Sequence, residues 1–147
     1  MKEDISLNEI YDVMLEVLES KKEFIFRPRG NSMRPLIKNG KTPVVLKKAE
    51  DSLKMGDVVL CRRQKGSYVF HRVAGFTADG GYILCGDNEL IRERGFYDKN
   101  VLGVMTAYYR GKRRISVSSS EYRFYVNVTL KAWKLMKRAL RKLKMIF

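Results

Sequence analysis

The sequence predicts a mainly β domain with one amphipathic helix before it and one after it. Between residues 24 and 117, short runs rich in β-branched and aromatic residues alternate with turn sequences. On either side of this region, apolar residues recur at helical spacing. Because the turns are short, we expect the strands to pair as antiparallel hairpins. The 147 residues match the length of a single domain.

The first helix is predicted over residues 7–20. Ser6 and Glu9 have the spacing of a capping box, in which each side chain binds a free backbone N–H at the helix start. Ile5 and Ile10 stand at the two positions of a hydrophobic staple. The face expected to be buried consists of Leu7, Ile10, Tyr11, Met14 and Leu18.

Seven strands are predicted within residues 23–118. Asp79-Gly80-Gly81 marks one tight turn, because glycine adopts positive φ at low cost. The predicted runs are EFIF (23–26), TPVVLKK (42–48), GDVVLCRR (56–63), SYVFHRVAGF (67–76), GYILCGD (81–87), VLGVMTAYYR (101–110) and RRISVS (113–118).

The two cysteines, Cys61 and Cys85, are too few for a disulfide framework. Each lies in an apolar strand-like run, so we expect buried free thiols, with one disulfide as the alternative for an exported chain. The N-terminal segment has acids throughout and no signal-peptide apolar block. The longest apolar stretch, residues 101–109, is far shorter than the ~20 residues of a spanning helix. We therefore expect a cytoplasmic protein, with peripheral attachment to the inner membrane leaflet as an option.

The second helix begins near Glu121, which divides the chain into a domain of residues 1–120 and a basic helix of residues 121–147. The chain carries a net charge of +14, and the last 17 residues hold seven basic residues and no acid. An apolar stripe runs along this helix opposite the basic residues. The stripe consists of Tyr125, Val128, Ala132, Leu135, Met136, Ala139, Leu143, Ile146 and Phe147.

Two interpretations of this helix stay open. The stripe packs on the β domain, or the helix lies in a membrane interface, where a tryptophan and basic flanks are typical. The residues expected to contact an anionic membrane are Lys131, Trp133, Lys134, Arg138, Arg141 and Lys142. A basic cluster also suits nucleic acid. The sequence argues against that partner, because residues 7–20 are too short for a helix-turn-helix and DNA contact requires no apolar stripe.

His71 is the single histidine. A lone histidine gives no metal site here, because neither cysteine has ligand spacing, and we expect no metal and no cofactor. Imidazole is, however, the usual base for a serine nucleophile, and an acid usually holds its tautomer. Asp87, after a strand end, and Glu93 are the candidate acids.

Four segments occur in an order that resembles the boxes of signal peptidases, within a clan that includes LexA-like self-cleaving repressors. They are GNSMRPLI (30–37), LKMGDVVL (53–60), VFHRV (69–73) and CGDNELIRERGFY (85–97). The resemblance implies a LexA/signal-peptidase-like antiparallel β fold over residues 30 to about 104. It also implies Ser32 as the nucleophile, His71 as the general base and Asp87 as the third member of the catalytic triad. The Ser-His type is similar to signal peptidases of the endoplasmic reticulum, archaea and some spore-forming bacteria. Glu93 stands where that subfamily often has a second acid.

The sequence departs from the signal-peptidase pattern in three ways. Gly30 replaces the Ser or Thr that often serves as an oxyanion donor, so the Ser32 N–H acts alone or with help from Asn31. The first Gly-Asp pair of the family is Gly40-Lys41 here. We also expect no counterpart of the membrane anchor that most signal peptidases carry. Met33 is expected to bury its side chain beneath the serine turn.

These observations predict a serine endopeptidase that cleaves a leader or signal-type segment from a peptide or protein precursor. The resemblance suggests small residues just before the cut, and an extended substrate along a strand edge. Two other functions stay open: a catalytically inactive binding module of the same fold, and a basic nucleic-acid-binding protein related to LexA.

Overall fold

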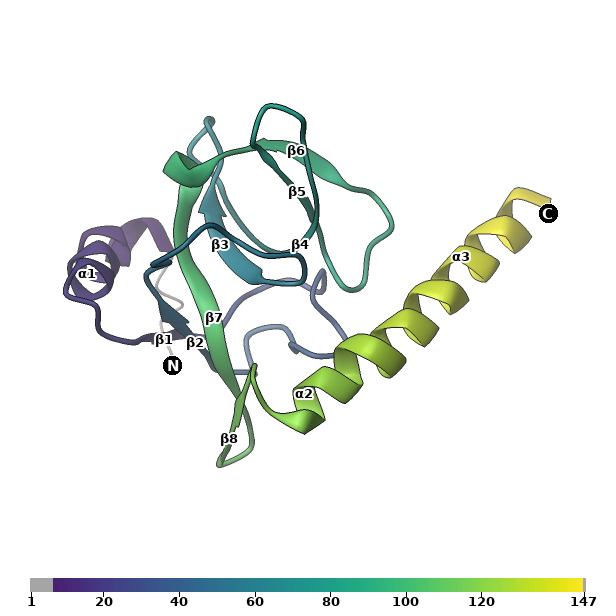
Figure 1. The fold of residues 1–147 in the computed structure, drawn as a ribbon. Helices are drawn as coiled ribbons and strands as arrows, with labels where there is room; N and C mark the ends of the chain where they lie inside the picture. The colour runs from purple at the N-terminus through teal and green to yellow at the C-terminus, as the bar shows by residue number, and fades with distance from the viewer. Residues whose placement is uncertain (1–6, 147) are drawn as a thin grey trace.

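The computed structural model describes residues 7–146, and the predicted capping box and staple residues Ser6 and Ile5 lie outside them. The fold is one eight-stranded antiparallel sheet with a helix at each end of the chain, as predicted (Figure 1). The elements are α1 (Leu7–Glu19), β1 (Phe24–Phe26), β2 (Val44–Lys47), β3 (Val58–Arg62), β4 (Tyr68–Phe76), β5 (Tyr82–Cys85), β6 (Glu93–Phe96), the 3-10 turn η1 (Asp98–Asn100), β7 (Val101–Arg110), β8 (Arg113–Ser116), α2 (Ser120–Phe124), the π-helical turn η2 (Tyr125–Thr129) and α3 (Leu130–Ile146).

The strands follow the order β1-β2-β7-β3-β4-β5-β6 across the sheet, and β8 pairs with β7. Every neighbouring pair is antiparallel. Register shifts interrupt four of the pairings, and such bulges bend a sheet and increase its twist. The long strand β7 joins the two parts of the sheet, because it lies between β2 and β3.

All seven predicted strands are present, and β6 is an additional strand that pairs with β5. Its sequence, ERGF, contains no apolar alternation, and Gly95 adopts a φ of 95°. A glycine inside so polar a run indicates a turn rather than a strand. The pairing of β6 with β5 therefore depends on tertiary contacts that the sequence of β6 does not reveal.

Helix α1 buries Met14 and Leu18 against the sheet, and Leu7 and Tyr11 pack at the edge of the same core. A second apolar cluster, on the other part of the sheet, includes Cys61. Both cysteines are free and buried, as expected. Burial raises the pKa of Cys61 to about 12, so its thiol stays protonated and unreactive.

The C-terminal helix has a break in its periodicity that the sequence pattern did not predict. Ser119 caps it by accepting a hydrogen bond from the Tyr122 N–H. In η2, the Leu130 N–H donates to the Tyr125 carbonyl, five residues back. Leu130 therefore lies above Tyr125, where a regular α-helix would place residue 129.

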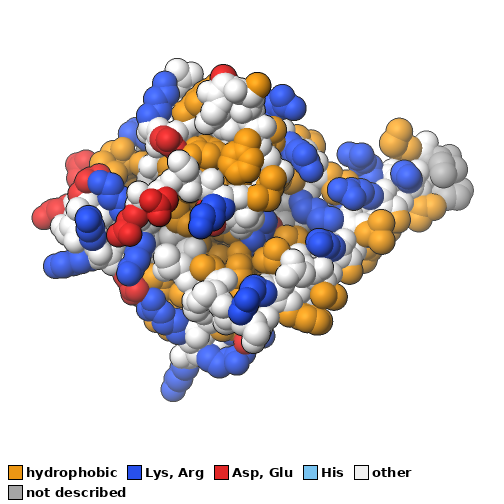
Figure 2. Space-filling view, in the orientation of Figure 1, with side chains coloured by type: hydrophobic (Ala, Val, Ile, Leu, Met, Phe, Trp, Pro, Cys, Tyr) orange, Lys and Arg blue, Asp and Glu red, His pale blue; other side chains and the backbone are white. Residues whose placement is uncertain are grey.

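This π turn changes which face of α3 meets the body. Tyr122, Tyr125 and Leu130 are buried in the main core. Beyond the turn, the members of the predicted apolar stripe from Ala132 to Leu143 face solvent, and Leu135 is 66% exposed. Figure 2 shows basic side chains along one edge of the projecting helix and hydrophobic side chains along the other. Within the described residues, no helix is long and apolar enough to cross a membrane.

Candidate active site

Ser32 lies in the long turn between β1 and β2, which is tied down at several points. Met33 is 3% exposed and anchors the turn from below, as predicted. Gly30 has a φ of 92°, which favours glycine, and its N–H donates to Asn39 Oδ1 at 2.7 Å. The Gly40 N–H donates to the Pro28 carbonyl at 2.8 Å. These contacts hold Ser32 at the surface with its side chain half-buried.

The loop of residues 86–89, after β5, fixes the backbone of Ser32. The Asn88 N–H donates to the Ser32 carbonyl at 2.8 Å, and Asn88 Nδ2 donates to the Asn31 carbonyl at 3.0 Å. A Cβ on Gly86 would lie 2.5 Å from the Ser32 carbonyl oxygen, so only glycine permits this approach. The G-D-N box is therefore the surface on which the serine turn rests.

His71, on β4, and Ser32 line the same cavity of about 240 Å³, together with Glu89. His71 is 9% exposed. Its Nε2 lies 3.8 Å from Glu89 Oε2, and its Nδ1 has no hydrogen-bond partner among the described residues. Burial lowers the pKa of His71, and the Glu89 carboxylate partly opposes that shift. The neutral imidazole that a general base requires is therefore favoured at neutral pH.

The reactive groups of Ser32 are unengaged. Within residues 7–146, neither its hydroxyl nor its N–H makes a hydrogen bond, including to His71. Nucleophile–base contacts are often loose before substrate binds. The site thus has a free hydroxyl, a free backbone donor and a neutral imidazole on one cavity. The side chain of Asn31 is exposed, and its carbonyl accepts the bond from Asn88.

Asp87, the expected third member of the triad, forms its hydrogen bonds with Arg72 and Tyr125. It is 1% exposed, and Arg72 holds it in a bidentate pair with both distances at 2.8 Å. The Tyr125 hydroxyl donates to Asp87 Oδ2 at 2.9 Å, and Arg72 also donates to the Tyr122 hydroxyl at 2.7 Å. No hydrogen bond joins Asp87 to His71 in the part of the chain that the structure describes.

Glu93, the second candidate acid, pairs with Arg63 through two bonds of 2.7 and 2.8 Å. This bonding lowers the pKa of Glu93. The acid that faces His71 is instead Glu89, for which the sequence predicted no role. Its only sequence signal was its position inside the 85–97 box, two residues after Asp87. Arg63, which also lines the cavity, carried no signal.

The C-terminal helix contacts the same loop. Trp133 Nε1 donates to Asn88 Oδ1 at 3.1 Å. Lys134 Nζ donates to the Gly86 carbonyl at 2.6 Å and to the Glu89 carbonyl. Two of the six residues expected at a membrane thus hold the 86–89 loop. The other four, Lys131, Arg138, Arg141 and Lys142, are exposed.

Across the described part of the chain, no group of three or more His, Cys, Asp or Glu side chains is arranged to hold a metal ion. Hydroxyl and imidazole chemistry is what the cavity provides.

Comparison with protein families matches residues 2–106 to the family described as Peptidase S24-like. That range contains the serine turn, β4 and the 86–89 loop. No curated protein and no solved structure gave a match in the corresponding searches. Because the match spans more than half of the 147 residues and the antiparallel fold is consistent with the LexA-like fold of that family, the chain belongs to the Peptidase S24-like family.

Proposed function

We propose that this protein is a serine endopeptidase that removes a leader or signal-type segment from a peptide or protein precursor. Family membership supports a serine peptidase-type domain. The observation that carries the proposal is the shared cavity of Ser32 and His71, which come from segments far apart in the sequence.

In the proposed mechanism, Ser32 Oγ attacks the carbonyl carbon of the scissile peptide while His71 takes the hydroxyl proton. The oxyanion accepts a hydrogen bond from the Ser32 N–H, and His71 then protonates the leaving amine. The acyl-enzyme that remains is hydrolysed by water, with His71 again acting as base. No step requires a cofactor.

The acids divide between two roles in this proposal. Glu89 lies near the imidazole and stabilises its protonated form as the proton is transferred. Asp87 acts as a positioning residue, because its pair with Arg72 anchors the loop that carries Asn88 and Glu89. Glu93 holds Arg63 at the rim of the cavity.

Labelling with a fluorophosphonate probe tests the activity most directly. The wild type should become labelled, while Ser32→Ala should not, and His71→Ala should label far more slowly. A matched control is Ser67→Ala, a serine on the turn before β4. A folded wild-type protein that takes no label, or equal labelling of Ser32→Ala, would favour the inactive binding module.

The precursor and the membrane are the proposed partners. The exposed apolar face of α3, with Leu135, Leu140 and Leu143, would enter the interface of an anionic bilayer. Tyr125 and Leu130 belong to the core, and Trp133 and Lys134 contact the 86–89 loop. The tail that binds the membrane in this proposal therefore starts after Lys134. Nucleic acid remains the competing partner for a chain of this charge.

Vesicle pelleting with the triple variant Leu135→Ser/Leu140→Ser/Leu143→Ser tests this partner. Binding to phosphatidylglycerol vesicles should be lost, whereas the control Val13→Ser/Met55→Ser/Ile91→Ser, also exposed apolar positions, should bind like wild type. Equal binding of vesicles by both variants would contradict the proposal that the apolar face of α3 binds the membrane. A gel shift with DNA that weakens steeply with salt would support the nucleic-acid alternative.

A further inference from the structure

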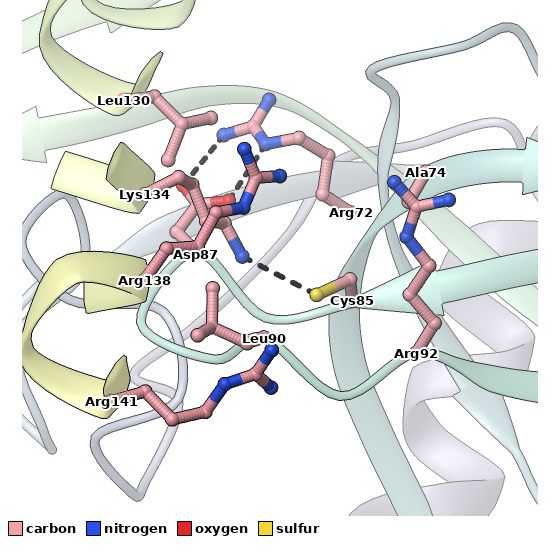
Figure 3. A pocket seen from close by; sticks show the side chains of 10 residues that line it. All are labelled: Arg72, Ala74, Cys85, Asp87, Leu90, Arg92, Leu130, Lys134, Arg138 and Arg141. Carbon is pink, nitrogen blue, oxygen red and sulfur yellow. Dashed lines mark hydrogen bonds and ion pairs between the residues drawn. The ribbon is translucent and has the colours of Figure 1, made fainter. Parts of the chain in front are cut away.

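A second cavity, of about 220 Å³, lies between α3 and the β4–β5 region (Figure 3). We call it the basic cavity. Five basic side chains and one carboxylate line it among the described residues. They are Arg72, Arg92, Lys134, Arg138, Arg141 and Asp87.

Two of the five cations already have partners. Arg72 pairs with Asp87, and Lys134 donates to backbone carbonyls. Asp87 has no capacity for a further cation, because Arg72 and Tyr125 occupy both of its oxygens and the side chain is 1% exposed.

The other three cations are unpaired. Within residues 7–146, Arg92, Arg138 and Arg141 make no hydrogen bond and no ion pair. Arg138 and Arg141 extend from α3 toward the strands, and Arg92 lies on the opposite wall (Figure 3). Three guanidinium groups that share one small cavity repel one another, and an anion between them would remove that cost.

The basic residues of α3 that line the cavity lie on one face of the helix. Lys134, Arg138 and Arg141 follow the i, i+4, i+7 spacing of one helix face, and that face is turned toward the body. Arg138 and Arg141 remain exposed on this face and Leu135 is 66% exposed on another, so beyond Leu130 the helix presents basic rather than apolar side chains to the cavity.

We infer that the basic cavity binds a phosphate-type oxyanion. Guanidinium groups bind phosphate through paired, charge-assisted hydrogen bonds. The cavity is smaller than the ~300–1,000 Å³ of sites for drug-sized ligands, so it suits a compact group. The exposed leucines of α3, Leu135, Leu140 and Leu143, do not line the cavity. A bilayer that contacted them would leave the cavity facing away, so free phosphate or a soluble phosphate monoester is the favoured source over a lipid headgroup.

Isothermal titration of the intact protein with inorganic phosphate, in chloride buffer of constant ionic strength, tests the site. Each lost guanidinium should weaken binding about tenfold. The variant Arg92→Gln/Arg138→Gln/Arg141→Gln should therefore lose binding. Its control, Lys112→Gln/Arg123→Gln/Lys144→Gln, removes the same charge from exposed positions that do not line the cavity and should bind phosphate like wild type.

Three outcomes would overturn the inference: no heat with wild type, equal weakening in both triple variants, or equal affinity for chloride and phosphate. Should the cavity variant lose its native circular dichroism spectrum, the single variant Arg138→Lys replaces it, because lysine keeps the charge but not the paired geometry. A second arm uses phosphatidic acid in vesicles. Retention that depends on Arg138 there, without binding of free phosphate, would reassign the ligand to a lipid headgroup and contradict the soluble source.

Discussion

His71 and Arg72 are neighbours on β4, and both are buried, yet their polar atoms have opposite surroundings. Arg72 donates to Asp87, to the Gly56 carbonyl and to the Tyr122 hydroxyl. His71 has one nitrogen without a partner among the described residues and the other 3.8 Å from a carboxylate. Because successive side chains point to opposite faces of a strand, the two serve different sides of the sheet.

The difference indicates which buried polar groups are free for chemistry. A buried polar group without a partner costs free energy, so such groups are rare and tend to mark functional sites. The group formed by Arg72, Asp87 and the two tyrosines is satisfied and holds the fold together. The cavity of Ser32 and His71 is unsatisfied and accessible. Substitutions in the two groups should therefore have different effects on activity and on stability.

The largest expected effect is on activity at the cavity. Ser32→Ala and His71→Ala should each lower kcat by ~10⁴-fold or more, and the double variant should be no worse, because members of one catalytic unit are not additive. The free energy of unfolding of both variants, measured by urea denaturation, should lie within about 1 kcal/mol of the wild-type value. Undiminished turnover by either single variant would contradict the proposed pair.

The next effect concerns stability at the satisfied group. Asp87→Asn leaves the buried Arg72 charge uncompensated and should lower the free energy of unfolding by about 3–5 kcal/mol, measured by urea denaturation. Glu93→Gln breaks a half-exposed pair with Arg63 and should cost less than about 1 kcal/mol. We also expect Asp87→Asn to cost more activity than Glu93→Gln. The reverse order would identify Glu93 as the more important acid.

A smaller effect is expected where the two regions meet, at Asn88. Asn88→Ala removes the bonds to the Asn31 carbonyl and to Trp133. Because the serine turn would lose its lateral support, kcat should fall about tenfold to a hundredfold with little change in KM. Trp133→Phe removes only the outer bond and should show a weaker loss. A change in KM alone would mean that the loop contacts substrate instead.

The smallest effect is a displaced pH profile. Protonation of His71 abolishes the base, so kcat/KM should rise with pH through a pKa below the usual histidine value. The Glu89 carboxylate raises that pKa, so Glu89→Gln should lower it further and move the acid limb of the profile to lower pH. Movement of the limb to higher pH, or no movement, would show that Glu89 does not face the imidazole in the working enzyme.

The fold was largely predictable because its signals are local. Alternating or apolar runs separated by Gly-containing turns placed seven of the eight strands, and the helix at residues 7–19 followed its periodicity. β6 was missed because Glu93, Arg94 and Gly95 gain their strand geometry from β5 rather than from their own preferences. The phase of α3 was missed because a π turn cannot be read from a stripe that assumes 3.6 residues per turn.

The candidate site was predictable in its members and not in its pairings. The ordered boxes predicted that Ser32 and His71 belong together, and they line one cavity. The role of each acid depends on which cation lies nearest in space. Arg72 and Arg63 occupy Asp87 and Glu93, and neither pairing has any signature in the sequence. Because those two acids pair with arginines, Glu89 is the carboxylate near the imidazole.

The π turn at Tyr125–Thr129 has a consequence for how the chain tolerates changes in length. A π turn holds one residue more than the α turn it replaces. Deleting Asn127, which is exposed, would convert the segment to a regular helix with Tyr125 and Leu130 four apart and on the same face. The core contacts and the outward apolar face would both survive. Inserting a residue just after Leu130 would instead rotate the outer helix by about 100° and place Trp133, Lys137 and Leu140 at the cavity in place of Lys134, Arg138 and Arg141. Evolution of this tail is therefore expected to accept a single-residue loss inside the turn and to reject a gain directly after it.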